Sequence, residues 1–530
     1  MPRVLVSDPL SEQGLAILRQ GPGLEIDYRP GLKEAELAAA IPGAHALVIR
    51  SGSKVTARVL EAATDLRVIG RAGIGVDNVD VQAASKRGVV VMNTPTGNAV
   101  TTAEHAIALL FSLARMIPQA SASMRGGKWE KKKFEGRELA GKTLGVVGLG
   151  NIGRIVADRA RGIGMQMIGF DPVLSSDRAA ALGVELVSLE GIWQRADAIT
   201  VHTPLTPETK GLVDDGVIAK LKRGVLLINA ARGGIYDLDA VLRGLESGHI
   251  GGVALDVFEV EPPPADLPIL KHERCIATPH LGASTTEAQD RVALEIAEQV
   301  VAYLATGATK NAVNMPSVSS EVAVKLTPYT DLAEWLGSFL AQAERGLAPR
   351  AIEVECVGDP AELSVKLIAA SAVAGFLRRF LDAPVNQVSA ASAAADRGIA
   401  LRELRTAAAR GKYASVVILR VFGEGGASRV VEGTLGADGS ARLVRWGDYE
   451  VEAHLGGPAL VVISLDKPGV IGFLGTTFGG ANVNVARVHL GLAGAGDAIS
   501  VWNLSQPIPT PVLEEVLRSP NIKAATAIEV

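Results

Sequence analysis

Short runs of apolar residues alternate with longer helical stretches over the first half of the chain. Many runs are apolar at every position, which is typical of parallel strands covered on both faces. The alternation predicts parallel α/β sheets, and the strands fall into two series, which indicates two lobes with a cleft between them. The expected strands are 4–8, 46–50, 67–71 and 89–93, then 143–148, 167–171, 198–203, 225–229, 252–257 and 275–278.

Two long helical stretches connect the expected lobes. Residues 98–117 form a helix that leaves the first lobe, and residues 285–304 form one that returns the chain to it. The first domain is therefore expected to be discontinuous, built from residues 1–97 and 283–315, with a Rossmann domain at 98–282.

The pattern changes beyond Lys310. Ala-rich helices are expected at 369–381 and 389–410, with a strand at 415–422, and a β-rich unit follows. The fold class predicted is α/β, with two Rossmann-like or flavodoxin-like lobes followed by two α+β domains at 316–455 and 456–530.

Composition excludes several classes of protein. A chain of 530 residues with 48% hydrophobic and 21% charged residues is typical of several soluble domains. The net charge of −4 provides no basic field for nucleic acid. With two distant cysteines, no apolar run of about 18 residues and no leader pattern, a cytoplasmic protein without membrane or metal is expected.

A glycine-rich turn after the strand at 143–148 predicts a dinucleotide site. Gly148, Gly150 and Gly153 form GxGxxG between a strand and a helix. The first glycine permits the turn, the second admits the pyrophosphate and the third allows close packing. Asn151 and Ile152 are expected to open the helix, whose free N–H groups attract phosphate.

Asp171 ends the next expected strand, eighteen residues after Gly153. A carboxylate there would accept from the ribose hydroxyls and repel a 2′-phosphate, which favours NAD over NADP. Asp before Pro also starts turns, so a purely structural role stays open.

Three later strand ends carry candidate catalytic groups: Arg232, Glu261 and His280. Arginine can clamp a substrate carboxylate with two hydrogen bonds, and histidine can take a hydroxyl proton near neutral pH. A carboxylate behind the imidazole would fix its tautomer, and Glu259 is an alternative to Glu261 in this role. Hydride transfer between a 2-hydroxy acid and NAD needs this set of groups.

Together with these motifs, GRAGIGVDNVD (70–80), VMNTPTGN (91–98), GKWEKKKFEG (127–136), VHTPL and TPHLGAST make residues 1–315 similar to the D-3-phosphoglycerate dehydrogenases. These enzymes form a branch of the D-isomer-specific 2-hydroxyacid dehydrogenase family. The resemblance implies NAD as cofactor and the catalytic set Arg232, Glu261 and His280. It also implies that Arg232 and His280 border the cofactor together with Ile74, Thr203, Ala230, Asp256 and Gly282, with Asp256 near the carboxamide.

The resemblance further implies a phosphorylated substrate. Arg50, Ser51, Arg71 and Gly73 would meet its phosphate and carboxylate, since cations and glycine-framed N–H groups bind phosphate. Lys131–Lys133 could reach a neighbouring subunit's site, although a solvated lysine run is the default interpretation. Charge alone is compatible with an unphosphorylated hydroxy acid.

The C-terminal unit resembles an ACT domain, a βαββαβ module that binds amino acids between paired chains. Asp466 and Asn484 would hold L-serine there, and a purely structural dimerisation role is the alternative. Residues 316–455 resemble the intervening domain of the longest relatives, where Arg442 and Arg445 could contact an anionic effector or simply form an exposed strand face.

The function implied is NAD-dependent oxidation of 3-phospho-D-glycerate to 3-phosphooxypyruvate, the first step of L-serine biosynthesis, by a homo-oligomer (a dimer or tetramer). One alternative is the same chemistry on glyoxylate, hydroxypyruvate or D-lactate. Others are a non-catalytic nucleotide sensor and an amino-acid sensor. A nucleotide sensor would need only the dinucleotide site, so the presence of Arg232, Glu261 and His280 argues against it.

Overall fold

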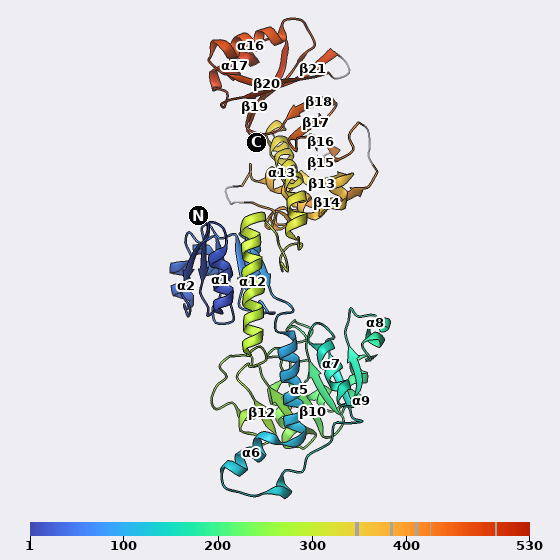
Figure 1. The fold of residues 1–530 in the computed structure, drawn as a ribbon. Helices are drawn as coiled ribbons and strands as arrows, with labels where there is room; N and C mark the ends of the chain where they lie inside the picture. Colours follow the sequence, from blue (N-terminus) through green and yellow to red (C-terminus); the bar gives the residue numbers. More distant parts are fainter. Residues whose placement is uncertain (345–348, 382–384, 409–411, 424–425, 493–495, 530) are drawn as a thin grey trace.

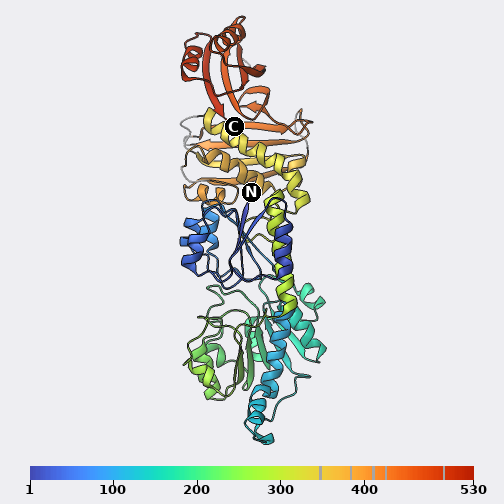
Figure 2. The same ribbon diagram turned by 60° about the vertical axis from the view of Figure 1, so that its left-hand side comes forward.

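The computed structural model describes residues 1–529 except 345–348, 382–384, 409–411, 424–425 and 493–495. Four sheets, of five, seven, six and four strands, follow one another along an elongated molecule (Figures 1 and 2). We call the five-stranded and seven-stranded units the first and second lobes, and the other two the third and fourth domains. The first lobe lies between the second lobe and the third domain (Figure 2).

The first lobe has a parallel sheet in the order β2-β1-β3-β4-β5. Four of its strands were predicted, whereas β2 was missed because it is an edge strand, EIDY, without a buried residue. The strands are β1 (Arg3–Val6), β2 (Glu25–Tyr28), β3 (Ala46–Ile49), β4 (Val68–Arg71) and β5 (Val90–Asn93). The helices between them are α1 (Glu12–Gln20), α2 (Glu34–Ala40), α3 (Ala57–Ala62) and α4 (Val81–Lys86).

The second lobe has a parallel sheet in the order β12-β11-β10-β9-β6-β7-β8. Six strands were predicted, and the two-residue β8 was missed. The strands are β6 (Thr143–Val147), β7 (Gln166–Phe170), β8 (Glu185–Leu186), β9 (Ala198–Val201), β10 (Val225–Asn229), β11 (Ile250–Leu255) and β12 (Cys275–Ala277). The helices are α7 (Gly153–Gly162), α8 (Ser176–Ala181), α9 (Leu189–Arg195), α10 (Asp215–Ile218) and α11 (Leu238–Glu246).

The two connecting helices lie where the sequence predicts them. Helix α5 (Ala99–Arg115) packs in the second lobe's core, and α12 (Thr286–Thr306) returns to bury its apolar face on the first lobe's sheet. After Met116, whose φ is 53°, the chain turns into α6 (Ile117–Arg125). Among the described residues, no single helix is long and apolar enough to span a membrane. Only α5 and α6 taken together reach that length and composition, and this pair is sharply bent.

The third domain packs two long helices on a mixed sheet in the order β14-β13-β15-β16-β17-β18. The prediction of one helix at 389–410 was wrong over the described residues 389–408: α15 is short, Gly398 (φ +68°) follows it, and β14 pairs in parallel with β13. Tertiary pairing here outweighs local helix propensity. The elements are α13 (Ser320–Ala343), β13 (Pro349–Val357), α14 (Val365–Leu377), α15 (Ala390–Ala395), β14 (Ala400–Thr406), β15 (Val416–Gly423), β16 (Ser428–Leu435), β17 (Ala441–Trp446) and β18 (Tyr449–His454).

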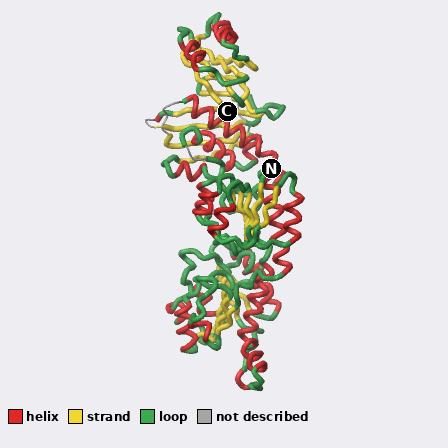
Figure 3. The backbone as a smooth tube through the Cα atoms, turned by 90° about the vertical axis from the view of Figure 1, so that its left-hand side faces the viewer, coloured by secondary structure: helices red, strands yellow, loops and turns green. Residues whose placement is uncertain are grey.

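The fourth domain has the element order βαββαβ, with an antiparallel sheet β20-β21-β19-β22. Its sheet shares one continuous core with the third domain, because Val461, Val501 and Ile528 belong to the same buried cluster as Phe339 of α13. Figure 3 shows the two sheets following one another. The elements are β19 (Pro458–Leu465), α16 (Val470–Gly480), β20 (Val485–Leu492), β21 (Asp497–Leu504), α17 (Thr510–Leu517) and β22 (Ile522–Glu529).

Candidate active site

The turn between β6 and α7 has the geometry of a dinucleotide loop. Gly148 has φ +91°, and a Cβ there would lie 2.6 Å from the carbonyl oxygen of His202. A Cβ on Gly153 would lie 1.9 Å from the carbonyl oxygen of Gly148. At Gly150 a Cβ would meet nothing within 4 Å, so this glycine faces the open side from which a pyrophosphate could approach. The loop therefore fits a dinucleotide.

Helix α7 begins at Gly153, so Asn151 and Ile152 lie in the turn before it rather than in its first turn. The Asn151 side chain is fixed on both sides: its Nδ2 donates to the carbonyl oxygen of Pro95 at 3.0 Å, and its Oδ1 accepts from Arg154 at 3.0 Å. Because Pro95 precedes α5, Asn151 ties the glycine loop to the segment that joins the lobes.

Asp171 lies directly after β7 and turns toward the glycine loop. Its Oδ2 accepts from the Leu149 N–H at 2.9 Å, and its Oδ1 accepts from the Val173 N–H at 3.0 Å. The second bond is the turn contact expected of Asp before Pro. Each carboxylate oxygen keeps acceptor capacity for a ribose hydroxyl, so the two interpretations of Asp171 are compatible.

Two further predicted cofactor residues follow strands of the same sheet. Thr203 follows β9, and its buried Oγ1 has no hydrogen-bond partner among the described residues. Ala230 follows β10 and is buried. Both lie at carboxyl ends of parallel strands, the edge at which such sheets bind ligands.

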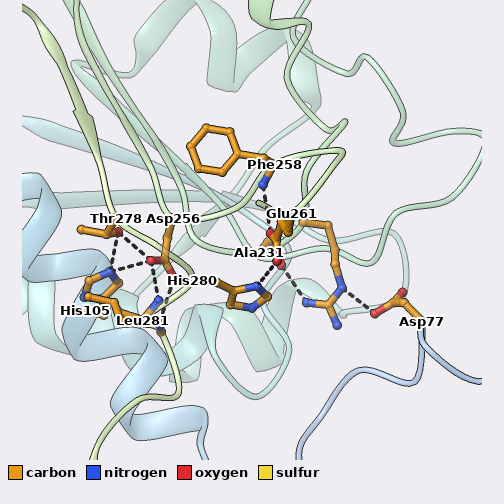
Figure 4. A network of polar contacts seen from close by, with 11 residues as sticks. Asp77, His105, Ala231, Asp256, Phe258, Glu261, Thr278, His280 and Leu281 are labelled. Carbon is orange, nitrogen blue, oxygen red and sulfur yellow. Dashed lines mark hydrogen bonds and ion pairs between the residues drawn. The ribbon is translucent and has the colours of Figure 1, made fainter. Parts of the chain in front are cut away.

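The predicted catalytic histidine is paired with Glu261. The distance from His280 Nδ1 to Glu261 Oε2 is 2.7 Å, and the other carboxylate oxygen accepts from the Phe258 N–H at 3.1 Å. In contrast, the side chain of Glu259 lies against Gly234. Of the two glutamates left open by the sequence, the structure therefore brings Glu261 to the imidazole (Figure 4).

Asp256 holds the turn that carries the histidine. Its side chain is fully buried at the end of β11 and accepts from Thr278 Oγ1 (2.6 Å), Leu281 N (2.7 Å) and Gly282 N (2.8 Å). These bonds clamp both flanks of residue 280, whose backbone has the unusual φ of +53°. Asp256 thus shapes the turn that carries His280.

His105 of α5 completes this network, and sequence reasoning missed it. Its Nε2 lies 3.2 Å from both Asp256 Oδ1 and Thr278 Oγ1 (Figure 4). Burial would raise the pKa of Asp256, but hydrogen bonds from His105, Thr278 and Leu281 outweigh it and lower that pKa. These bonds therefore favour the ionised form of the carboxylate beneath the turn that carries His280.

Arg232 projects from a turn that Asn229 fixes. Asn229 Nδ2 donates to the carbonyl oxygen of Arg232 at 2.8 Å, and its Oδ1 accepts from the Ala231 N–H at 3.0 Å. The Arg232 guanidinium donates through Nε to Asp77 Oδ2 at 2.8 Å and through Nη1 to the carbonyl oxygen of Ala231 at 2.7 Å. Ala231 lies beside Glu261 and His280 in Figure 4, with Asp77 approaching on a separate segment. The structure thus brings the three predicted catalytic segments together.

Two loops of the first lobe face this region with cations. Buried Asp8 accepts from the N–H groups of Arg50 (2.6 Å) and Ser53 (3.0 Å), which folds the exposed Ser51 outward. Asn78 ties the same loop through bonds of 2.7 Å to the carbonyl oxygens of Arg50 and Ser53. The sequence did not single out Asp8 or Asn78, because neither has a local signature.

The second loop carries Arg71 and Gly73. Burial, followed by the nearby positive charge of Arg232, lowers the pKa of Arg71 to about 10. Gly73 donates its N–H to Thr94 Oγ1 at 2.7 Å. The next residue, Ile74, presents a half-buried side chain, and its carbonyl oxygen accepts from Asn93 Nδ2. A concentration of cations at the lobe junction suits a small anionic substrate.

The remaining predicted residues lie apart from this site. Lys131–Lys133 form an exposed 3-10 turn after α6, next to the largely exposed Trp129. Arg442 pairs with Glu452 at 2.8 Å and Arg445 with Glu432 at 3.5 Å, which favours the strand-face interpretation of these arginines.

The two candidate effector residues belong to the fourth domain. Asp466 and Asn484 are both exposed, in the turn before α16 and immediately before β20. The Asn484 side chain donates to Ser505 Oγ at 2.8 Å.

Comparisons with known proteins identify the family of the chain. Residues 107–282 match the family model described as "D-isomer specific 2-hydroxyacid dehydrogenase, NAD binding domain", and residues 325–446 match "D-3-phosphoglycerate dehydrogenase intervening domain". The fold and the site thus define an NAD-binding dehydrogenase of the D-2-hydroxyacid class. Curated proteins called D-3-phosphoglycerate dehydrogenase, from Archaeoglobus fulgidus (40% identical, 99% of this chain and 100% of theirs) and Bacillus subtilis (38%, 99% and 99%), are similar over their full lengths. The chain belongs to the D-3-phosphoglycerate dehydrogenase family.

Solved structures resemble the two lobes. The TT0316 protein of Thermus thermophilus is 35% identical with a TM-score of 0.55, covering 59% of this chain and 99% of that one. A D-lactate dehydrogenase of Aquifex aeolicus, complexed with NAD and lactic acid, is 26% identical with a TM-score of 0.53, covering 59% and 100%.

Proposed function

We propose that this protein oxidises 3-phospho-D-glycerate to 3-phosphooxypyruvate with NAD, the first step of L-serine biosynthesis. The observation that carries the proposal is the bonded pair of His280 and Glu261 beside the Arg232 turn. A nucleotide sensor would have no use for an exposed imidazole backed by a carboxylate, whereas a dehydrogenase needs one to move a proton.

In this reaction His280 takes the substrate's C2 hydroxyl proton on Nε2 while Glu261 accepts from its Nδ1–H. The carboxylate fixes the tautomer and stabilises the imidazolium that forms. Arg232 binds the substrate carboxylate with the end of its guanidinium. NAD held by the glycine loop would supply the acceptor for the C2 hydride, and C2 would be left with a carbonyl oxygen.

The glycine loop and Asp171 would hold the pyrophosphate and ribose of NAD. Arg232 and His280 would border the nicotinamide end of the cofactor. Asp256 would lie near the carboxamide, and either its carboxylate oxygens or the turn that it holds would make the contact. The full set proposed to line NAD is Gly148, Gly150, Asn151, Ile152, Gly153, Asp171, Thr203, Ala230, Arg232, Asp256, His280, Gly282 and Ile74.

The phosphate of the substrate would be bound by Arg50, Ser51 and the Arg71–Gly73 loop. In a homo-oligomer, Lys131–Lys133 could add a cation from a neighbouring subunit, since this run is exposed on a segment that extends past the second lobe (Figure 1). The test is an NAD-linked assay that compares 3-phospho-D-glycerate with D-glycerate. A kcat/KM at least about 100-fold higher for the phosphorylated acid is expected, because charged hydrogen bonds to phosphate would be lost. Faster use of D-glycerate would reject the phosphate site.

The fourth domain is proposed to act as an ACT-type regulatory module that binds L-serine at Asp466 and Asn484. Its βαββαβ order and the exposure of both residues support this. The exposed Leu490 on edge strand β20 is suited to pairing with another copy in a dimer or tetramer. Calorimetry with L-serine tests the assignment, and cell fractionation tests the proposed cytoplasmic location.

A further inference from the structure

The loop after β4 brings a first-lobe carboxylate to the second lobe's key cation. Asp77 Oδ2 accepts from Arg232 Nε at 2.8 Å, although 155 positions separate the two residues. On the other side, Arg232 Nη1 donates to the carbonyl oxygen of Ala231 at 2.7 Å. The guanidinium is therefore held at two points, one in each lobe.

The backbone around Asp77 is fitted to this contact. A Cβ on Gly75 would lie 1.8 Å from Arg232 Nη2 and 2.7 Å from Asp77 Oδ2. Any side chain at position 75 would displace the guanidinium or the carboxylate, so the loop can pack against the pair only with glycine there.

The contact is poorly placed to stabilise the fold. The side chain of Asp77 is 65% exposed, and that of Arg232 is 29% exposed. Ion pairs with one partner so exposed add little to folding stability because water screens them. We therefore expect the contact with Asp77 to affect the orientation of the Arg232 guanidinium more than the stability of the fold.

The hydrogen-bond geometry leaves one useful face. The two bonds use Nε and one N–H of Nη1, and within the described residues the remaining N–H groups, on Nη1 and Nη2, have no recorded acceptor. These end groups form the fork that grips a carboxylate with two parallel bonds.

We infer that Asp77 is a positioning residue, which rests on the proposed function: it orients Arg232 across the cleft so that the guanidinium fork faces the substrate carboxylate. Because Asp77 and Arg232 belong to different lobes, the orientation of the guanidinium depends on the two lobes lying against each other as they do here.

The test uses Asp77→Ala and Asp77→Asn in the full-length protein. Asp77→Ala should raise the KM for 3-phospho-D-glycerate about tenfold, a value expected for a partly exposed charged hydrogen bond. The KM for NAD and kcat should change less than about twofold, since the effect is on carboxylate binding. Asp77→Asn should recover part of the loss, because its amide oxygen still accepts from Nε.

A matched control is available in the same lobe as Arg232. Asp215 pairs with Arg243 at the surface and is 62% exposed, so Asp215→Asn removes a comparable charge away from the cleft and should leave every constant unchanged. Titration of the NADH-loaded protein with oxalate measures the same contact without turnover, and Asp77→Ala should weaken that binding about tenfold.

Two results would overturn the inference. A lower KM and tighter oxalate binding in Asp77→Ala would mean that Asp77 competes with the substrate for Arg232, and unchanged values would mean that the pair is inert. Failure of the proposed function gives a different pattern. The wild type would then fail to oxidise 3-phospho-D-glycerate, while oxalate binding would still decide the role of Asp77.

Discussion

His280 is proposed to act through two hydrogen bonds, one from Nδ1 to Glu261 and one between Nε2 and the substrate hydroxyl. The bond behind it, 2.7 Å to Glu261, is present, and it leaves Nε2 for the substrate on a side chain that is 47% exposed. The exposure matters because a buried imidazole could not reach a reacting hydroxyl, whereas an unpaired one would rotate freely.

Replacing His280 by Ala should therefore lower kcat by about 10²–10⁴-fold, the usual contribution of a general base. His272→Ala is the control, because this histidine lies in the same lobe and its recorded side-chain bond is a local one to the Arg274 N–H. Steady-state kinetics with saturating NAD measures the effect. Turnover that survives in His280→Ala would refute the catalytic assignment.

The two cysteines give a second residue-scale prediction. Burial raises the pKa of Cys275 and of Cys356 to about 12. Because the thiolate is the reactive form, neither should be alkylated by iodoacetamide in the folded protein at pH 8. Mass spectrometry should detect labelling only after denaturation, and rapid labelling of Cys356 in the native protein would contradict its buried placement.

At this scale the sequence predicted the groups that do chemistry and missed those that hold them. Arg232, Glu261 and His280 lie in short motifs, so their types and spacing are visible. Asp77 contacts Arg232 at a sequence separation of 155 residues, and His105 contacts Thr278 at a separation of 173. No local sequence pattern predicts such contacts. Only the folded chain brings them together.

At the scale of the elements, the turn before α7 contains one glycine that should matter for stability, Gly153, and one that should matter for NAD binding, Gly150. Gly153→Ala should destabilise the protein by several kcal/mol, since its Cβ would lie 1.9 Å from a carbonyl oxygen. Gly150→Ala should leave the free energy of unfolding within about 0.5 kcal/mol, yet weaken NAD binding at least tenfold, because its methyl group enters the ligand's space.

Chemical unfolding and NAD titration of both variants check this contrast. Equal loss of stability in the two variants would contradict the geometry of the turn. Normal NAD affinity in Gly150→Ala would show that the pyrophosphate approaches from elsewhere.

His202 follows β9, and although the residue is only partly buried, its ring Nδ1 is buried without a hydrogen-bond partner among the described residues, so this histidine should make stability depend on pH. Burial lowers the pKa of His202 from 6.5 to about 4, so the folded state keeps the ring neutral. Between these values the unfolded chain takes up a proton that the folded state excludes. Up to about 3 kcal/mol of stability should therefore be lost as the pH falls from 6.5 to 4, with no contribution above this window.

His202→Gln removes that titration and serves as the comparison. The unfolding free energy of the wild type minus that of the variant should be constant above pH 6.5. Below pH 6.5 this difference should fall, because only the wild type loses stability through His202. A difference independent of pH would mean that His202 is solvated.

Periodicity predicted most of the parallel strands because strands such as β3, β9 and β10 are buried on both faces. Periodicity failed for exposed strands, which are ordered by pairing with a neighbouring strand and not by a buried face of their own. Strand β14, ALRELRT, exposes most of its side chains and is ordered by its parallel pairing with β13. The edge strand β2 fails for the same reason.

On the scale of the whole molecule, the third and fourth domains share a core that joins Phe339 of α13 to Val461, Val501 and Ile528. A chain ending at 455 would therefore expose the apolar surface of the third domain that the fourth domain covers. The sequence indicated the two units from their change in character, but the pattern along the chain does not show that they share a core.

A chain ending at 315 should keep turnover within a few-fold of the full protein and lose binding of L-serine. The solved two-lobe relatives cover 59% of this chain and nearly all of their own, which supports folding of the lobes without the later domains. Calorimetry and the NAD-linked assay on both chains measure this. Serine binding that persists in the short chain would place the effector site elsewhere.

The most direct test of the central claim is a crystal structure of the protein with NADH and 3-phosphooxypyruvate bound. We expect His280 Nε2 within about 3 Å of the C2 oxygen, the Arg232 fork on the carboxylate and C2 facing the nicotinamide. A complex in which the imidazole and the guanidinium both point away from that carbon, with the lobes closed, would contradict the account.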